Sequence, residues 1–166
     1  MKRILIIGSP GSGKSTLARR MSEKLDIPCV YLDRLFWKPN WVETPKEEFD
    51  MLVRAELEKE SWIIDGNYKR TLSMRLNYAD TVIWLDYPSI ICIWRVWWRH
   101  GKIRPDMTEN CEEKRDKEFF EFLKYIWNFK KEQKGEIEKD LAKSDAEIII
   151  VHNKKEFKAL EKRFGI

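Results

Sequence analysis

Cysteine is scarce in this chain, and its placement argues against two kinds of scaffold. The three cysteines, Cys29, Cys92 and Cys111, lie far apart, and no CxxC pair occurs. An odd number of scattered thiols argues against a disulfide framework and against a zinc site. We therefore expect reduced cysteines, which is their usual state in the cytoplasm.

Long apolar runs are also missing. No apolar stretch approaches the roughly 20 residues that a membrane-spanning helix needs. The apolar run at Met1–Ile7 is too short for a secretory signal and leads directly into a loop that contains glycine. The sequence thus predicts a cytoplasmic protein without a membrane partner.

Neither sign of charge dominates. The chain carries 32 basic and 28 acidic residues, for a net charge of +4, and the two signs are interleaved along its length. Duplex DNA favours proteins with a long basic face, which this pattern does not provide. DNA is kept as an alternative partner that the charge pattern does not support. A monomer and a homodimer are both compatible with the sequence.

Five short apolar runs recur along the 166 residues, and amphipathic helical patterns separate them. The runs are continuous rather than alternating, as expected for parallel strands buried on both faces. The alternation of the two patterns predicts one α/β domain over residues 1–166, with right-handed crossovers and a doubly wound sheet. The expected strands are Ile4–Ile7, Cys29–Leu32, Trp62–Ile64, Val82–Leu85 and Ile148–Val151, and the expected helices are Lys14–Leu25, Pro45–Lys59, Ser89–His100, Cys111–Lys131 and Lys154–Phe164.

Local signals indicate where two of these helices begin. Thr44 and Glu47 have the spacing of a capping box, which would put Pro45 at the first helical position. Asp86 precedes a Tyr-Pro-Ser segment, so we expect it to cap the helix that begins at Ser89.

Glycine is sparse, yet three of the seven glycines fall within the eight residues Gly8–Ser15. This segment, Gly-Ser-Pro-Gly-Ser-Gly-Lys-Ser, matches the G-x-x-x-x-G-K-[ST] phosphate loop. It follows an apolar run and opens an amphipathic helix, which is the context that the motif requires. The alternative is an ordinary strand–turn–helix connection with a glycine turn.

The chemistry of a phosphate loop explains these residue types. Glycines let backbone N–H groups approach phosphate oxygens, and the helix N-terminus favours the anion. Lys14 supplies a positive charge for the β- and γ-phosphates, the Ser15 hydroxyl ligates Mg²⁺, and Thr16 reaches the α-phosphate. The segment predicts binding of ATP with Mg²⁺, while GTP stays an alternative. The expected nucleotide-binding residues are Gly8, Ser9, Pro10, Gly11, Ser12, Gly13, Lys14, Ser15 and Thr16.

Two acids follow expected strands directly, where ligands bind in open parallel sheets. Asp65 could hold Mg²⁺ together with Ser15, or it could cap a turn, since it precedes Gly66. Asp33 could bind the substrate, accept a hydroxyl proton or assist the metal. The alternative for Asp33 is a solvated loop acid.

Two arginines, Arg95 and Arg99, are spaced four residues apart on an expected helix and therefore lie on one face. Arginines on a closing lid can stabilise the charge that spreads over a transferred phosphoryl group. The alternative is the solvated edge of an amphipathic helix. The expected catalytic residues are Lys14, Asp33, Asp65, Arg95 and Arg99.

Polar and aromatic residues gather around the two acids in the sequence. Aromatic rings can stack on a base or close a pocket, and they can equally be packing residues. The expected substrate-binding residues are Asp33, Arg34, Trp37, Trp41, Gly66, Asn67, Tyr68 and Arg70.

Taken together, these segments resemble the adenylate-kinase-like P-loop kinases over nearly the whole chain. The segments Leu32–Trp41 and Ile64–Tyr68, with the helix that carries Arg95 and Arg99, narrow the resemblance to the bacterial topology modulation proteins. The resemblance implies a three-layer P-loop NTPase fold whose five-stranded parallel sheet has the order 2-3-1-4-5. It also implies a substrate-binding insert at about residues 34–60 and a helical lid at about residues 95–120.

The functional prediction is an ATP-dependent phosphotransferase that acts on a small molecule. Nucleoside monophosphate kinases typically read Asp-Gly-Phe-Pro-Arg after the third strand, whereas residues 65–70 of this chain read Asp-Gly-Asn-Tyr-Lys-Arg. A nucleoside, a nucleotide or another small alcohol is therefore open as the acceptor. The alternatives are a nucleotide-dependent DNA-binding, topology-modulating regulator and a GTPase switch, although no Asn-Lys-x-Asp guanine signature occurs.

Overall fold

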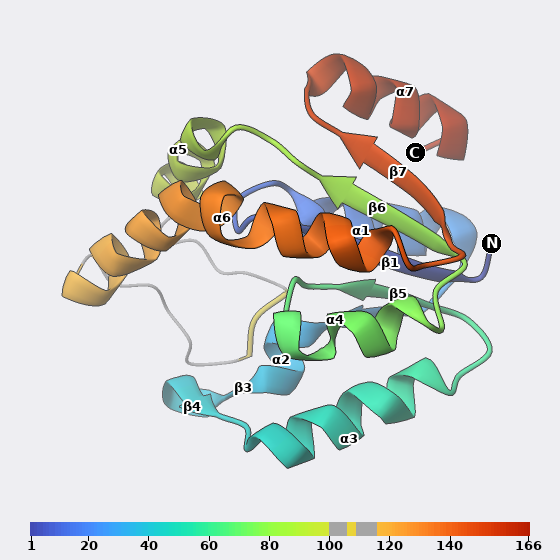
Figure 1. Cartoon of the computed structure of the whole chain (residues 1–166), viewed down its shortest axis with the longest axis horizontal. Helices are drawn as coiled ribbons and strands as arrows, with labels where there is room; N and C mark the ends of the chain where they lie inside the picture. The colour runs from blue at the N-terminus through green and yellow to red at the C-terminus, as the bar shows by residue number, and fades with distance from the viewer. Residues whose placement is uncertain (100–105, 109–115) are drawn as a thin grey trace.

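A five-stranded parallel sheet forms the centre of the computed structural model, which describes residues 1–99, 106–108 and 116–166 (Figure 1). Its order is β2-β5-β1-β6-β7. Counted among themselves, these strands have the order 2-3-1-4-5, which confirms the expected fold class. The strands are β1 (Arg3–Gly8), β2 (Cys29–Tyr31), β5 (Trp62–Asp65), β6 (Thr81–Leu85) and β7 (Glu147–Val151).

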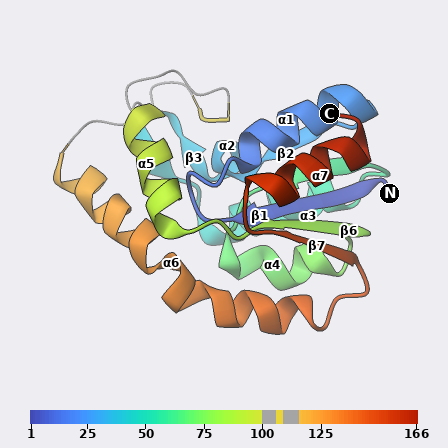
Figure 2. The same ribbon diagram turned by 90° about the horizontal axis from the view of Figure 1, so that it is seen from above.

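Helices cover both faces of this sheet and give the molecule three layers (Figure 2). On β1, Ile4 and Ile6 pack into one core, whereas Leu5 and Ile7 pack into the other. Both faces of the strand are therefore buried, which explains its continuous apolar run. The helices are α1 (Lys14–Leu25), α2 (Leu32–Phe36), α3 (Lys46–Leu57), α4 (Lys69–Leu76), α5 (Ser89–Arg99), α6 (Lys117–Leu141) and α7 (Lys154–Phe164).

The segment before α3 differs from the expected capping box. A small antiparallel hairpin of β3 (Trp37–Lys38) and β4 (Val42–Glu43), joined by a 3-10 turn, brings Thr44 back to the end of α2. There the Thr44 hydroxyl donates to the Leu35 carbonyl at 2.8 Å. Pro45 is the N-cap, without a side-chain cap bond, rather than the first helical residue. The capping-box prediction was wrong because the hairpin directs the Thr44 hydroxyl to the Leu35 carbonyl instead of to α3.

The prediction for Asp86 was also wrong. Its carboxylate is buried and forms ion pairs with Lys130 at 2.8 Å and Lys134 at 3.1 Å, both from α6. Because α6 lies across the end of β6, these two ammonium groups engage the acid. Lys134 in turn has its pKa raised, chiefly by the hydrogen bond to Asp86.

The long helix also differs from its expected bounds. Asp116 caps α6 by accepting a hydrogen bond from the Phe119 N–H at 3.0 Å, and the helix continues ten residues beyond the predicted end at Lys131. Residues 111–115 of the predicted helix, including Cys111, lie outside the described residues. None of the described helices is long and apolar enough to cross a lipid bilayer.

Candidate functional site

The loop between β1 and α1 is tightly curled. Gly8, Gly11 and Gly13 have φ angles of 146°, 79° and 100°, which L side chains rarely adopt. A Cβ on Gly8 would lie 2.5 Å from the Leu85 carbonyl oxygen, and one on Gly11 would lie 2.4 Å from that of Cys92. The glycines are therefore required both by the turn and by its close contact with β6 and α5.

Lys14 begins α1 and bends back over this loop. Its Nζ donates to the Ser9 carbonyl at 3.0 Å. Burial lowers the pKa of this ammonium group, while the carboxylates of Asp65 and Asp33 act in the opposite direction. The loop thus holds a partly buried cation close to two acids, an arrangement that a polyphosphate would complement.

Asp65 ends β5 beside this lysine. Its carboxyl group is almost fully buried, and burial raises the pKa to about 6 although the charge of Lys14 opposes the change. Its Oδ1 atom is buried without a hydrogen-bond partner in the described part of the chain. An orphaned carboxylate oxygen of this kind is a suitable ligand for a hard cation such as Mg²⁺.

A third acid, Asp106, joins this group without any signal in the sequence. Its Oδ2 accepts a hydrogen bond from the Ser15 hydroxyl at 2.9 Å, across 91 residues of chain. Within residues 1–99, 106–108 and 116–166, no three acid, histidine or cysteine side chains cluster closely enough to hold a metal alone. Water and phosphate oxygens would therefore complete a magnesium site built on Ser15 and Asp65.

Both predicted arginines of α5 face this region. The Arg95 Nη1 donates to the Ser12 carbonyl at 2.9 Å, and its guanidinium lies 4.6 Å from the centroid of the Tyr87 ring. Arg99 lines a large cavity beside the loop. The rest of the predicted lid falls largely on residues 100–105 and 109–115, which lie outside the described residues.

This cavity has a volume of about 1310 Å³ and opens next to the loop. On its far side the Tyr68 hydroxyl donates to the Asp33 Oδ1 at 2.8 Å. Burial, followed by the charge of Asp33, raises the pKa of Tyr68, so its proton stays on the phenol. The predicted residues that line the cavity are Gly8, Pro10, Gly11, Gly13, Lys14, Ser15, Thr16, Asp33, Trp37, Trp41, Asp65, Gly66, Asn67, Tyr68 and Arg99.

Aromatic rings form one wall of this cavity. Trp37 and Trp41, from the β3–β4 hairpin and its 3-10 turn, meet edge to face with centroids 5.2 Å apart. Phe36 lies against Tyr68 at 4.9 Å. The hairpin therefore places flat, mostly apolar surfaces opposite the acid Asp33, which suits a small ring-bearing molecule.

Two predicted substrate residues do not line the cavity. Arg70 forms a forked ion pair with Asp50 of α3, with its shortest contact at 2.7 Å. Arg34 lies over the Tyr31 ring, with 5.5 Å from Cζ to the centroid. Neither guanidinium is among the residues around the cavity.

Arg75 of α4 supports the candidate site and was not among the residues predicted from the sequence. Its side chain is fully buried and donates to the carbonyls of Gly66 and Tyr68 at 2.8 and 2.7 Å. It thereby fixes the turn that presents Asp65 and Asn67 to the cavity. An arginine on a short helix gives no sequence signal that distinguishes it from a surface residue.

A second, smaller cavity of about 480 Å³ lies on the other side of Gly13. Arg95 and Tyr87 form one wall, and Phe157 of α7 forms another. Gly13 and Thr16 line both cavities, and the acids Asp33, Asp65 and Asp106 line the larger one, whereas Glu161 lines the smaller one.

Comparisons with known proteins agree with this architecture. No family profile matches the sequence. An alignment of 105 positions, which covers 50% of this chain, is 31% identical to an adenylate kinase from Pseudarthrobacter chlorophenolicus. The match spans 53% of that relative, so the chain aligns with about half of its length.

Solved kinase structures match over the whole chain. Shikimate kinase from Acinetobacter baumannii, in complex with shikimate, has 14% identity and a TM-score of 0.62, covering 99% of this chain and 94% of that one. Deoxyadenosine kinase from M. mycoides, with bound dATP, has 15% identity and a TM-score of 0.50, with both chains covered completely. The fold is thus that of the P-loop kinases. The match to the adenylate kinase has the higher sequence identity, across half of this chain.

Proposed function

We propose that this chain is an ATP-dependent, Mg²⁺-using phosphotransferase whose acceptor is a small molecule with a hydroxyl group. The observation that carries the proposal is the curled loop Gly8–Ser15, which holds a partly buried Lys14 beside the orphaned Oδ1 of Asp65. The kinase folds of the similar proteins support the same reaction class. A large cavity beside the loop leaves room for a second substrate.

The nucleotide would lie across the loop. Its phosphates would contact the backbone N–H groups and Lys14, and its base would enter the smaller cavity beside Arg95 and Tyr87. The Ser15 hydroxyl and the Asp65 carboxylate would hold the magnesium ion, which supplies charge neutralisation to the phosphates. Binding would draw Lys14 from the Ser9 carbonyl to the phosphates.

The acceptor would occupy the large cavity. We propose that Asp33 accepts the proton of the attacking hydroxyl, while Tyr68 holds the carboxylate in place through its hydrogen bond. Trp37 and Trp41 would pack against the body of the acceptor. The phosphoryl group would move between the two cavities past Arg99, whose positive charge would stabilise it.

The acceptor that this site favours carries no phosphate of its own. A clamp for a monophosphate needs cations that are not already paired. Among the described residues Lys69 and Arg19 line the cavity but pair with Glu136 and Glu23. Arg70 is paired with Asp50, and Arg34 lies outside the cavity. A phosphate dianion would also lie next to the carboxylate of Asp33. A nucleoside or another small alcohol needs no cation clamp and is not repelled by Asp33, because it brings no negative charge to the site.

The test supplies Mg²⁺·ATP, and separately Mg²⁺·GTP, with a panel of nucleosides, nucleoside monophosphates and small alcohols. We expect one uncharged acceptor to stimulate ADP release well above the reaction with water and to appear as a phosphorylated product by mass spectrometry. If no acceptor does so, the kinase proposal is overturned.

Two matched lysine variants control for loss of the fold. Lys14→Ala should weaken ATP binding and lower turnover by about 100-fold or more, whereas Lys24→Ala, at the far end of α1, should leave both unchanged. Unchanged nucleotide affinity in Lys14→Ala would contradict the phosphate loop itself. The resemblance to topology modulation proteins adds a DNA mobility-shift assay with and without ATP, in which we expect no shift at physiological salt.

A further inference from the structure

The outer face of α5 carries no charge. Ile90, Trp94 and Trp98 are each more than 60% exposed on this helix, and Ile91 and Trp97 are also exposed. The only charged residues of α5 are its two arginines, which face the phosphate loop and the large cavity. Charged residues make up 36% of the chain, so an exposed helix face without charge is unusual for this protein. Exposed apolar patches of this kind indicate an interaction site.

The apolar surface continues from α5 onto α6. Ser89 donates to the Trp127 carbonyl at 3.3 Å, and the Trp97 ring lies 6.0 Å from that of Phe119. Phe120 and Trp127 of α6 are exposed next to these contacts. We call this surface the aromatic face, and it comprises Ile90, Ile91, Trp94, Trp97, Trp98, Phe120 and Trp127.

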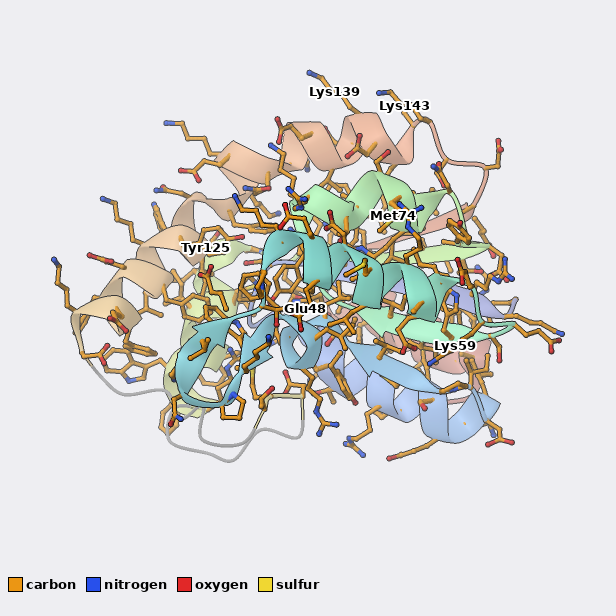
Figure 3. All side chains as sticks on the ribbon, turned by 90° about the horizontal axis from the view of Figure 1, so that it is seen from below. Glu48, Lys59, Met74, Tyr125, Lys139 and Lys143 are labelled. Carbon is orange, nitrogen blue, oxygen red and sulfur yellow. The ribbon has the colours of Figure 1, made fainter. Side chains whose placement is uncertain are left out.

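The aromatic face lies at the end of the molecule away from both chain termini (Figures 1 and 2). The opposite half of α6 has a different character, since Lys139 and the following Lys143 extend away from the body into solvent (Figure 3). The exposed aromatic side chains of α6, Phe120, Tyr125 and Trp127, all lie in the first half of the helix.

We propose that the aromatic face is a self-association surface that a second copy of this chain covers. With about 250 Å² for a large aromatic side chain, the exposed fractions of the four tryptophans correspond to roughly 550 Å² of surface. The isoleucines and Phe120 increase this area toward the ~800 Å² that each partner contributes to a standard interface. The patch is therefore large enough for a stable dimer.

The charge distribution favours a second copy over a lipid surface. Helices that lie on membranes combine an apolar face with lysines and arginines that reach the lipid headgroups. In the described part of the chain the arginines of α5 instead point inward, and at the edge of the patch Lys117 pairs with Glu121 at 3.8 Å. Lys124 is the one exposed lysine between Phe120 and Trp127 among the described residues. A two-fold dimer juxtaposes identical surfaces, and a face with one lysine among its seven apolar side chains brings little repulsion against itself.

Self-association would also support the active-site arginines. The outer side of α5 forms the proposed interface, while its inner side holds Arg95 against the loop. Covering the outer side would restrict movement of the helix and hence of both guanidinium groups. This inference is independent of the phosphotransfer reaction, because it rests on the surface alone.

The test is sedimentation velocity of the full chain between about 1 and 100 μM. We expect a mass twice the 20.1 kDa of one chain at the higher concentrations. Trp94→Glu and Trp98→Glu place a charge in the patch and should each weaken dimerisation on the order of 100-fold. Met51→Glu, at an exposed position on α3 outside the aromatic face, is the matched control and should dimerise as the wild type does.

Each outcome of this experiment decides the inference. A wild type that stays at 20.1 kDa throughout, or glutamate variants that dimerise unchanged, overturns it. So does co-sedimentation of a monomeric chain with phosphatidylcholine–phosphatidylglycerol vesicles, which would identify a lipid surface. If circular dichroism shows that a glutamate variant has lost helix, Trp127→Ser supplies the test with less perturbation.

Discussion

Asp65 allows the electrostatic argument to be tested in the free protein. Its pKa is raised from the ordinary value of 3.8 to about 6, chiefly by burial. Between these two values the folded chain binds more protons than the unfolded chain, so stability falls as the pH rises through that window. A difference of this size corresponds to about 3 kcal/mol once the pH is well above the folded pKa.

Replacing the acid by its neutral isostere should remove this cost. Asp65→Asn should be more stable than the wild type by up to about 3 kcal/mol at pH 7.5 and by roughly half of that at pH 5. For a chain of this size the gain at pH 7.5 corresponds to an increase in melting temperature of about 6–12 °C. The same variant should lose Mg²⁺-dependent turnover, because the amide no longer supplies a negative ligand.

The assay is urea unfolding of wild type and variant at both pH values, in EDTA and without nucleotide. A variant that is equally stable or less stable at pH 7.5 would refute the reasoning, because burial of the carboxylate would then carry no cost. Glu60→Gln is the control, since that exposed acid should give no comparable gain in stability.

Three further predictions concern the loop, the hairpin and the acceptor site. Gly11→Ala should cost about 2 kcal/mol or more and abolish ATP binding, because its Cβ meets a carbonyl oxygen at 2.4 Å, whereas Gly135→Ala in open space on α6 should stabilise by about 1 kcal/mol. Calorimetry and nucleotide titration distinguish these outcomes. Thr44→Val should lower the free energy of unfolding by about 1–2 kcal/mol in chemical denaturation, while Glu47→Ala should change it little. Equal decreases for the two variants would instead support the capping box. Tyr68→Phe should lower kcat about tenfold and leave ATP affinity unchanged, and an unaltered kcat would show that the phenol does not position its acid partner.

The main sheet was predictable because its signals are local. A continuous apolar run such as Ile4–Ile7 indicates a strand that is buried on both faces, and the glycine motif predicts the conformation of the loop that follows. Asp33 and Asp65 were found by the same logic, since parallel strands end at one edge of the sheet. These features can be predicted from neighbouring residues in the sequence and from the general geometry of βαβ units.

The remaining features depend on contacts between distant segments. Strands of two residues in the β3–β4 hairpin are too short for a pattern, and the hairpin redirects Thr44 away from its expected role. Asp106 meets Ser15 across 91 residues, a pairing that no local spacing encodes. Arg70 is near the site in sequence, yet its ion pair with Asp50 directs it elsewhere.

The double ion pair of Asp86 gives α6 two mechanically distinct halves. Lys130 and Lys134 fasten the middle of the helix to the end of β6, while Phe119 and Tyr125 in its first turns line the large cavity. A movement that widens the cavity would therefore rotate the first half of α6 about the ion-paired residues Lys130 and Lys134. The second half would stay with the sheet, whereas Phe119 and Ile126 of the first half are buried in the core and would have to repack as the helix moves.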